Sequence, residues 1–521
     1  MPQFYRAMTA TCNGAPSLAD PNHHMETSGR ISVYFNAIRG LDRSRLCEYL
    51  RKSLQESILD TFLLIFHCRD CRGGKGERDI GRWGLIWLLI NCPTQFLKVL
   101  PLIPTYGRWD DIMSLWPGSL DLSNTEVWEA YDTPRPHTLM VILLCDIQMK
   151  CVTLMADQLR ADRGAMFGGR VVTLCAKWAP TEGDALDRRH HHYRTLYTTM
   201  GCTPRELRRE YITPLRKYLQ VVETLMCGGK WDSIDFSSVP SHTMRRLKKA
   251  LVKHVPTALH EWKEKLNEGM VKVNALQLYP HELIRDIYNR EEVDSIMEAQ
   301  WEVLLKQAGE LTDALFVVDV SGSMSYGSGS SVVPLHVSVA MGLLGSAITT
   351  GPFHNHVITF DGNPTFQVIN GTLSERARDI RNIPWGGNTN IQATFELILR
   401  KATEFELPPE DMPKKIFIIS DMQFDQTNQE GKTNFQDLEE QYAKSNYTRP
   451  QLIFWNVNGT TTDFPVQTDD EGTAMISGFS TSILRTIMRG VDFNPYSILR
   501  ETIDHERFDS IRRVCTPLRI V

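Results

Sequence analysis

Residues 313–323 read DALFVVDVSGS, and this stretch decides the fold of the second half of the chain. The apolar run Leu315–Val320 has the length and the β-branched content of a buried strand. Asp319, Ser321 and Ser323 alternate at the end of that run, so that one carboxylate and two hydroxyls share a loop. We therefore predict a strand that ends in a small, oxygen-rich loop.

Working outward from this strand, short apolar runs alternate with amphipathic segments. Further strands are predicted at His356–Phe360, Lys415–Asp421, Gln451–Val457 and Ala474–Phe479. Helices are predicted between them at Val332–Ala347, Ile391–Thr403, Phe435–Lys444 and Thr481–Met488. Because continuous apolar strands separated by helices indicate a parallel sheet covered on both faces, we predict a doubly wound α/β domain over residues 311–521.

Before this domain, residues 31–310 show helical periodicity and no strict repeat, which predicts an all-α, helical-repeat-like module. One expected helix face carries apolar residues four apart, namely Leu46, Leu50, Leu54, Ile58 and Phe62. Further helices are predicted at Thr138–Arg160, Pro204–Met226, Met244–Leu266 and Glu291–Gln307. Residues 1–30 are polar and aperiodic, and we interpret them as a loose N-terminal arm.

The composition places the 521-residue chain among globular proteins. Its longest unbroken apolar runs are too short for a membrane span, and its N-terminus lacks the apolar segment of a secretory signal. The odd count of 11 cysteines argues against a disulfide framework, and the single C-x-x-C motif, Cys68–Cys71, has no second copy that would complete a zinc site. We expect packed free thiols, an intracellular protein (in cytoplasm, nucleus or an intracellular particle), and no membrane partner.

The oxygen donors at the predicted strand ends form a candidate metal site. Thr389 and Asp421 also follow sheet elements, and ligands of such folds gather where the strands end. Few carboxylates among several hydroxyls suit Mg²⁺, and Mn²⁺ or Ca²⁺ would satisfy the same donors. The alternative is that Asp319 only braces its loop. The complete predicted set of metal ligands is Asp319, Ser321, Ser323, Thr389 and Asp421.

This pattern resembles the metal-ion-dependent adhesion site of von Willebrand factor A domains. The resemblance implies a ligand-binding site in which the cation keeps one coordination position for an acidic side chain of a partner protein. It does not imply catalysis, because no nucleophile with a base accompanies the site. We therefore expect no enzyme activity, and a metal-dependent hydrolase using Asp319 and Asp421 ranks last among the alternatives.

A helical module followed by such a domain resembles the Ro autoantigen-like (TROVE) ribonucleoproteins. It resembles more closely an uncharacterised family with the same two-part layout. The closer resemblance covers roughly residues 30 to 490, and its motifs are Arg69–Arg78, Ile103–Asp111, Ala176–Pro180, Tyr279–Leu283, Trp385–Thr389 and Ser420–Asp425. A Ro-like architecture implies RNA as a ligand of the helical module.

Three groups of cations are candidate nucleic-acid contacts. They are the glycine-rich loop with Arg72, Lys75 and Arg78, the stretch with Arg188, Arg189 and Arg194, and the stripe with Arg205, Arg208 and Arg209. Each group has a simpler alternative, an interhelical turn or a solvated helix face. No P-loop pattern occurs, so no nucleotide cofactor is expected.

Charge leaves two functions open. Residues 1–310 carry 40 basic and 37 acidic residues, and the stretch from Arg160 to Lys217 carries 12 and 6. The local excess of basic residues favours a non-enzymatic, Ro-like RNA-binding scaffold with a divalent cation. The nearly neutral net charge of the whole module argues against that hypothesis. The alternative is a protein–protein interaction or structural component of a large assembly, without RNA, that binds an acidic partner residue at the cation.

Overall fold

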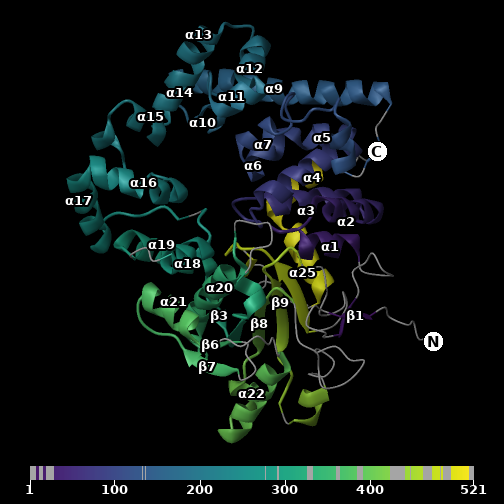
Figure 1. Cartoon of the computed structure of the whole chain (residues 1–521), viewed down its shortest axis with the longest axis vertical. Helices are drawn as coiled ribbons and strands as arrows, with labels where there is room; N and C mark the ends of the chain where they lie inside the picture. The colour runs from purple at the N-terminus through teal and green to yellow at the C-terminus, as the bar shows by residue number, and fades with distance from the viewer. Residues whose placement is uncertain are drawn as a thin grey trace.

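The protein consists of a ring of helices standing on a sheet domain, as the computed structural model shows in Figure 1. Helical residues occupy most of the chain before residue 310, and a six-stranded sheet follows. The residues that the structure describes are 8–10, 16–18, 28–131, 133–134, 137–275, 277–289, 293–325, 332–359, 364–383, 391–422, 440–445, 447–460, 472–481, 483–484 and 494–515.

The N-terminal arm contains regular structure that the prediction of a loose arm did not include. Strands β1 (Met8–Ala10) and β2 (Pro16–Leu18) pair antiparallel. Helix α1 then begins at Gly29, slightly before the predicted start of the module. The short strands were missed because three residues each are too few for a period of two to be recognised.

A buried bundle of four helices opens the module. It consists of α1 (Gly29–Asn36), α2 (Arg43–Glu56), α3 (Ile58–Arg69) and α4 (Arg78–Asn91). The predicted i+4 stripe is broken at Ser57, whose side chain accepts a hydrogen bond from the Asp60 N–H and so starts α3. Leu46, Leu50 and Phe62 are therefore buried, whereas Ile58 is 48% exposed.

The rest of the ring consists of shorter helices and one long one. Their bounds are α5 Pro93–Val99, α6 Ile103–Tyr106, α7 Trp109–Met113, α8 Thr125–Ala130, α9 Thr138–Phe167, α10 Cys175–Trp178, α11 Ala185–His190, α12 His192–Met200, α13 Pro204–Glu206, α14 Thr213–Tyr218, α15 Val222–Cys227, α16 Ser241–His254, α17 Pro256–Asn267, α18 Pro280–Tyr288 and α19 Ser295–Ala308.

Two predicted helices are divided by proline. The predicted helix over 204–226 becomes α13, a π-helical turn (Leu207–Ile212), α14 and α15. The π-helical turn ends just before Pro214, which lacks the amide hydrogen that a continuous α-helix needs, and the break before α15 falls at Gln220, whose φ is +48°. The predicted helix over 244–266 is divided at Pro256 into α16 and α17. Both prolines stand in the first turn of the helix that follows, where the missing donor costs nothing.

The long helix α9 begins at Thr138 as predicted and extends to Phe167. In the described part of the chain it is the one helix that is long and apolar enough to cross a membrane, with 39% of its most apolar window buried. A helix in the core of a globular protein can be equally long and apolar, and α9 packs against α5, α7, α10, α12 and α14. We therefore interpret α9 as a helix that links two parts of the ring.

The sheet has the strand order β10-β9-β8-β4-β6-β7. Five strands are parallel, as predicted, and β7 pairs antiparallel with β6 at the edge. The edge strand was missed because its four residues are half-exposed and lack an apolar run. The bounds are β4 Ala314–Val318, β6 His356–Thr359, β7 Thr365–Val368, β8 Lys415–Ser420, β9 Gln451–Asn456 and β10 Thr473–Ser477; a separate pair is β3 Leu311–Thr312 with β5 Thr349–Thr350.

Helices on both faces bury the sheet, which confirms the predicted α/β class. Helix α20 packs closely because Gly342 and Gly345 leave no room for a Cβ atom against Val318 and Phe316 of β4. The other helices of this half are α21 Leu373–Asn382, α22 Ile391–Glu404, α25 Pro495–Ile503 and α26 Asp509–Cys515, and α20 spans Pro334–Ile348. Most of the predicted helices 435–444 and 481–488 lies outside the described residues.

The last two helices return to the beginning of the chain. Arg507 lies in the short 3-10 turn (Glu506–Phe508) directly before α26, and it forms an ion pair with Asp70, whose side chain is fully buried. Arg500 Nη1 lies 2.9 Å from Asp60 Oδ2, and the Tyr34 hydroxyl lies 3.0 Å from that of Thr502. The C-terminal helices are thus bonded to the helical module.

Candidate functional site

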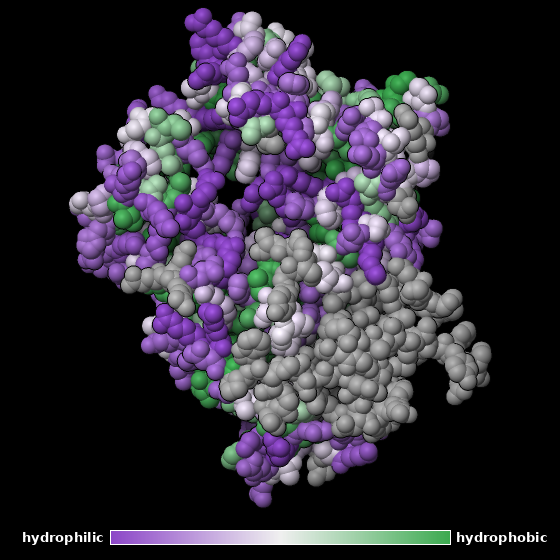
Figure 2. Space-filling model, viewed as in Figure 1, coloured by the Kyte–Doolittle hydropathy of each residue, from purple (hydrophilic) through white to green (hydrophobic). Residues whose placement is uncertain are grey.

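A large cavity of about 2070 Å³ lies inside the ring of helices. Figure 2 shows the centre of the molecule hollowed, with hydrophilic side chains around the hollow. Ten arginines and two lysines line the cavity, against seven carboxylates. The cavity is therefore positively charged, although the module as a whole is nearly neutral.

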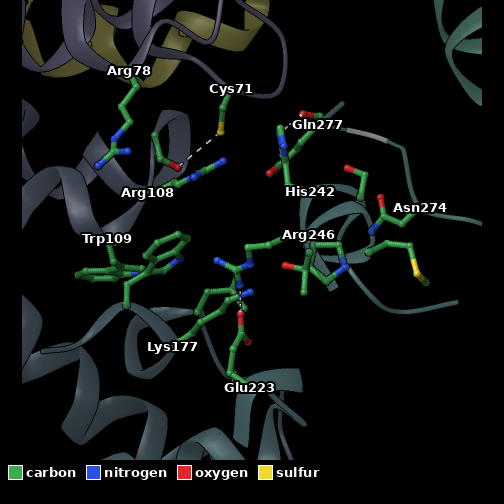
Figure 3. Close-up of a pocket in the computed structure, with 18 of the residues that line it drawn as sticks. Cys71, Arg78, Arg108, Trp109, Lys177, Glu223, His242, Arg246, Asn274 and Gln277 are labelled. Carbon is green, nitrogen blue, oxygen red and sulfur yellow. Dashed lines mark hydrogen bonds and ion pairs between the residues drawn. The ribbon is translucent and has the colours of Figure 1, made fainter. Parts of the chain in front are cut away.

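One wall of the cavity concentrates cations that have no counter-charge. Arg78 at the start of α4, Arg108 before α7 and Lys177 in α10 form no ion pair within the described residues. Figure 3 shows Arg78, Arg108 and Lys177 around one region of the cavity, beside Trp109. The Arg108 guanidinium lies 5.3 Å from the ring centre of Trp178. Such cations can hold a phosphate, and the indole ring beside them can stack on a base.

A buried carboxylate fixes the position of Arg108. The Arg108 N–H donates to Asp111 Oδ2 at 2.8 Å, and Arg69 and Arg82 donate to the same carboxylate through Nε, each at 2.7 Å. A Cβ atom at Gly107 would lie 2.3 Å from Asp111 Oδ2, so only glycine fits before Arg108. The buried Asp111 carboxylate therefore holds the backbone at Arg108, whose side chain lines the cavity.

A second arginine supports the segment that carries Lys177 and Trp178. The Arg216 guanidinium donates to the carbonyl oxygen of Ala176 at 2.9 Å and to that of Ala179 at 2.8 Å. Arg216 therefore braces the loop around α10 and is not itself free to bind an anion.

Other arginines of the cavity lining are already paired with carboxylates. Arg246 lies 2.9 Å from Glu223, and Arg245 Nε donates to Asp286 at 2.7 Å. Figure 3 shows Arg246 and Glu223 joined by this ion pair. Arg245 and Arg246 thus differ from Arg78, Arg108 and Lys177, which form no ion pair within the described residues.

The predicted RNA contacts divide into two groups. Arg72, Arg78 and Arg208 line the cavity. The remaining arginines of the prediction are exposed on the outside, apart from the cavity lining, namely Arg188, Arg189, Arg194, Arg205 and Arg209. Arg108, Lys177 and Trp178 were missed, and their one signal in the sequence is that they lie in the motifs of the family resemblance.

Lys75 contradicts its prediction as an exposed phosphate ligand. It is 2% exposed, and its ammonium group donates to Ser477 Oγ at 2.8 Å and to the carbonyl oxygens of Tyr34 and Ala37. Burial lowers the pKa of Lys75 to about 8. The side chain turns inward because the helical module and strand β10 meet at this point, and so it joins the two halves of the protein.

The same glycine-rich loop closes the ring. The Tyr279 hydroxyl donates to the carbonyl oxygen of Gly76 at 2.9 Å, and Arg39 Nε donates to Glu77 at 3.0 Å. Gly76 has φ +71°, and a Cβ atom there would lie 2.1 Å from the Tyr279 hydroxyl. The loop thus joins the beginning of the module to its end, and the cavity is bounded on this side.

The candidate cation site lies at the ends of the neighbouring strands β4 and β8. Val318 pairs with Ile419, so Asp319 and Asp421 follow adjacent strand ends. Asp319 Oδ1 accepts a hydrogen bond from the Ser321 N–H at 2.9 Å, and Asp319 Oδ2 accepts one from Ser420 Oγ at 2.6 Å. Asp319 and Asp421 are buried in this arrangement.

The oxygen donors fit a hard cation. Ser321 Oγ and Ser323 Oγ lie 3.2 Å apart, close to the roughly 2.9 Å between neighbouring oxygens around an octahedral Mg²⁺. Ser323 is exposed, which leaves access from solvent. The fifth predicted ligand, Thr389, lies outside the described residues. Within the described parts, no cluster of three or more His, Cys, Asp or Glu side chains offers another metal site.

The cysteines that the structure describes are free thiols, as predicted. Cys68 is buried at the end of α3, and burial raises the pKa of its thiol to about 12. Cys71 is partly buried. The two residues of the C-x-x-C motif therefore pack as thiols.

Comparisons with known proteins place this architecture in a family. Two domains of unknown function match the chain, DUF2828 over residues 197–312 and DUF7788 over residues 313–521. The uncharacterized protein L728 of Acanthamoeba polyphaga mimivirus is 30% identical over 513 residues, covering 92% of this chain and 85% of that protein. The chain belongs to the DUF2828/DUF7788 family.

One solved structure resembles the DUF2828/DUF7788 chain over most of its length. The crystal structure of the Deinococcus radiodurans RO (RSR) protein covers 92% of this chain and 95% of its own, with 13% identity and a TM-score of 0.34.

Proposed function

We propose that this DUF2828/DUF7788 protein is a non-enzymatic RNA-binding scaffold whose helical ring holds single-stranded RNA in its cavity. The observation that carries the proposal is the wall of three cations without counter-charge, Arg78, Arg108 and Lys177, beside Trp178. Unpaired cations attract phosphates, and an adjacent indole stacks on an unpaired base.

The size of the cavity supports a polymeric ligand. Pockets for single small molecules measure roughly 300–1,000 Å³, and this cavity of about 2070 Å³ is larger. Sequence-tolerant stacking on aromatic side chains favours single strands over duplexes, whose bases already stack on each other. The ring closure at Gly76 and Tyr279 bounds the cavity, which favours a flexible strand.

Fluorescence anisotropy with a labelled single-stranded RNA at 50 and 200 mM salt tests the proposal. With three phosphates neutralised, affinity should fall roughly 20-fold between the two concentrations, because about 0.7 counterions are released per contact. Binding that does not depend on salt, or no binding at 50 mM, would contradict the proposal. It would favour the alternative of a protein-binding scaffold that works through the cation site.

We also propose that the sheet domain holds a divalent cation, Mg²⁺ in the first instance. Asp319, Ser321, Ser323 and Asp421 would ligate it, with Thr389 as the fifth ligand. The hydroxyl spacing at Ser321 and Ser323 and the adjacent strand ends support this assignment. The cation would supply a positive charge with a coordination position for an acidic side chain of a partner protein.

Replacement of Asp319 by asparagine tests the cation site. Asparagine retains the shape of the side chain and can still accept the Ser321 N–H, so the melting temperature should change by less than about 2 °C. Affinity for Mn²⁺ or Mg²⁺, measured by titration calorimetry, should fall roughly 10- to 100-fold or more. Replacing a residue that only hydrogen-bonds to a metal ligand typically lowers metal affinity by that factor, and Asp319 is expected to be a ligand itself. Unchanged metal affinity in the variant would exclude this site. Asp319→Ala is the harsher variant, because it leaves the buried Ser420 hydroxyl without its acceptor.

A further inference from the structure

Exposed aromatic and apolar side chains gather where helix α9 ends. Phe167, the last residue of α9, is 74% exposed, and Val171 in the loop that follows is 95% exposed. Tyr218, the last residue of α14, is 43% exposed, and its hydroxyl donates to the carbonyl oxygen of Arg170 in this loop at 3.2 Å. Two exposed rings on one surface differ from the singly scattered apolar residues that are normal on a protein. Phe167, Arg170, Val171 and Tyr218 form what we call the α9 patch.

The loop of the α9 patch leads directly into the cavity. Thr173 and Leu174, which follow Val171, line the cavity, and Leu174 is 49% exposed. Lys177 and Trp178, in α10, line the cavity one turn further along the chain. Helix α9 contacts both α10 and α14, and Figure 1 shows these three helices together in one part of the ring. The α9 patch therefore lies outside the cavity lining and continues from it.

The α9 patch is accompanied by cations that have no counter-charge. Arg170 and Lys217 are exposed and form no ion pair within the residues that the structure describes. The carboxylate of Glu210 is already engaged by Arg163 at 3.1 Å, and the Arg163 guanidinium lies 5.6 Å from the ring centre of Phe167. This combination of exposed rings and unpaired cations is complementary to the bases and phosphates of a single strand.

The cavity has room for only a short length of strand. Its volume of about 2070 Å³ is roughly two to seven times that of a pocket for one small molecule. Each nucleotide is a ligand of that size class, so a longer strand has to leave the cavity across its rim.

We infer that the α9 patch is a base-stacking platform for the part of an RNA strand that extends beyond the cavity. Phe167 and Tyr218 would each stack on a base, while Arg170 and Lys217 would hold phosphates. Stacking on an aromatic ring tolerates every base, so the platform would not select a sequence. This inference rests on the proposed function and extends the RNA-binding surface from the cavity to the outside of the ring.

The test compares two single-stranded RNAs, of about 4 and about 16 nucleotides, on the full chain. Fluorescence anisotropy at about 50 mM salt follows their binding to wild type and to Phe167→Ala/Tyr218→Ala. The double substitution should weaken binding of the long strand roughly 25-fold or more, about 5-fold for each ring, and binding of the short strand less than about 2-fold. Equal losses for the two strands, or an unchanged affinity for the long strand, would overturn the inference.

Two further variants show whether the aromatic rings themselves are responsible. Tyr218→Phe keeps the ring and loses only the hydroxyl that donates to Arg170, so it should bind the long strand within about 2-fold of wild type. Phe405→Ala is the matched control, because Phe405 is 65% exposed and lies 5.2 Å from Lys401 Nζ but is outside the cavity lining and follows α22 of the sheet domain. A loss of affinity in either variant as large as that of the double substitution would contradict ring stacking at the α9 patch.

Thermal melting checks that the double variant is folded. Because both rings are largely exposed, its melting temperature should change by less than about 2 °C. A larger fall would show that the rings support the fold of the loop, and the assignment as a platform would then be wrong.

Charge reversal at Arg78, Arg108 and Lys177 separates failure of this inference from failure of the proposed function. If the reversal abolishes binding of both strands and the double substitution changes neither, the cavity binds RNA and the platform is overturned. If the double substitution weakens the long strand and the reversal does not, the α9 patch binds RNA and the cavity proposal falls. If wild type binds neither strand, both fall, and the exposed rings would instead suit a protein partner.

Discussion

Replacement of Asp111 by alanine is expected to lower the free energy of unfolding by about 3–5 kcal/mol. Asp111 is fully buried and accepts hydrogen bonds from the Arg69 and Arg82 side chains and from the Arg108 N–H. Arg69 is itself only 3% exposed. Without the carboxylate, its guanidinium would remain charged and buried with no counter-charge, which is the costly outcome of breaking a buried ion pair.

Denaturant unfolding measures this effect, and the neighbouring Asp110→Ala provides the control. Asp110 forms an ion pair with Arg82 at 2.7 Å, but Arg82 would keep Asp111 as its partner. The control should cost about 1 kcal/mol or less. Equal losses for the two variants would show that Asp111 has no special place in the network. A folded Asp111 variant should also bind RNA more weakly, because Arg108 loses the acceptor of its backbone N–H.

Reversing the charge of Arg78, Arg108 and Lys177 to glutamate is expected to reduce affinity for single-stranded RNA by roughly 100-fold or more at 50 mM salt. Each substitution removes one phosphate contact and adds a negative charge inside a bounded cavity. The slope of log affinity against log salt should fall as well, by about 0.7 per lost contact. Because Arg78, Arg108 and Lys177 form no ion pair in the described structure, their replacement leaves no buried carboxylate unpaired.

The chain offers a control with the same change in net charge. Arg188, Arg189 and Arg194 are exposed on the outer face of the ring, and all three lie outside the cavity lining. Their replacement by glutamate should change affinity less than about 5-fold through the long-range field. If the outer variant loses as much affinity as the cavity variant, RNA binds the outer surface and the cavity assignment is wrong.

The sheet domain could be predicted in detail from the sequence. The runs at 315–320, 415–421 and 451–457 are apolar over most of their length because helices cover both faces of the sheet. Strand β7 at 365–368 escaped prediction because an edge strand needs no apolar run. The candidate cation ligands follow from the same logic, since parallel strands end at one edge.

The ring of helices could be predicted only in outline. Apolar periodicity identified helices, but their limits depend on side-chain caps and prolines, as at Ser57 and Pro214. Contacts between distant residues decided the rest. The hydroxyl of Tyr279 reaches the carbonyl oxygen of Gly76, and no local pattern encodes that separation.

By itself, the sequence determined the α and α/β halves and the order of the oxygen donors, because these depend on local periodicity and strand ends. Only the tertiary structure decided which cations can bind an anion. Lys75 and Arg78 stand three residues apart in one basic loop, yet Lys75 is buried against Ser477, whereas Arg78 faces the cavity. Charge in a sequence is local, but the partner that neutralises or buries it comes from far along the chain.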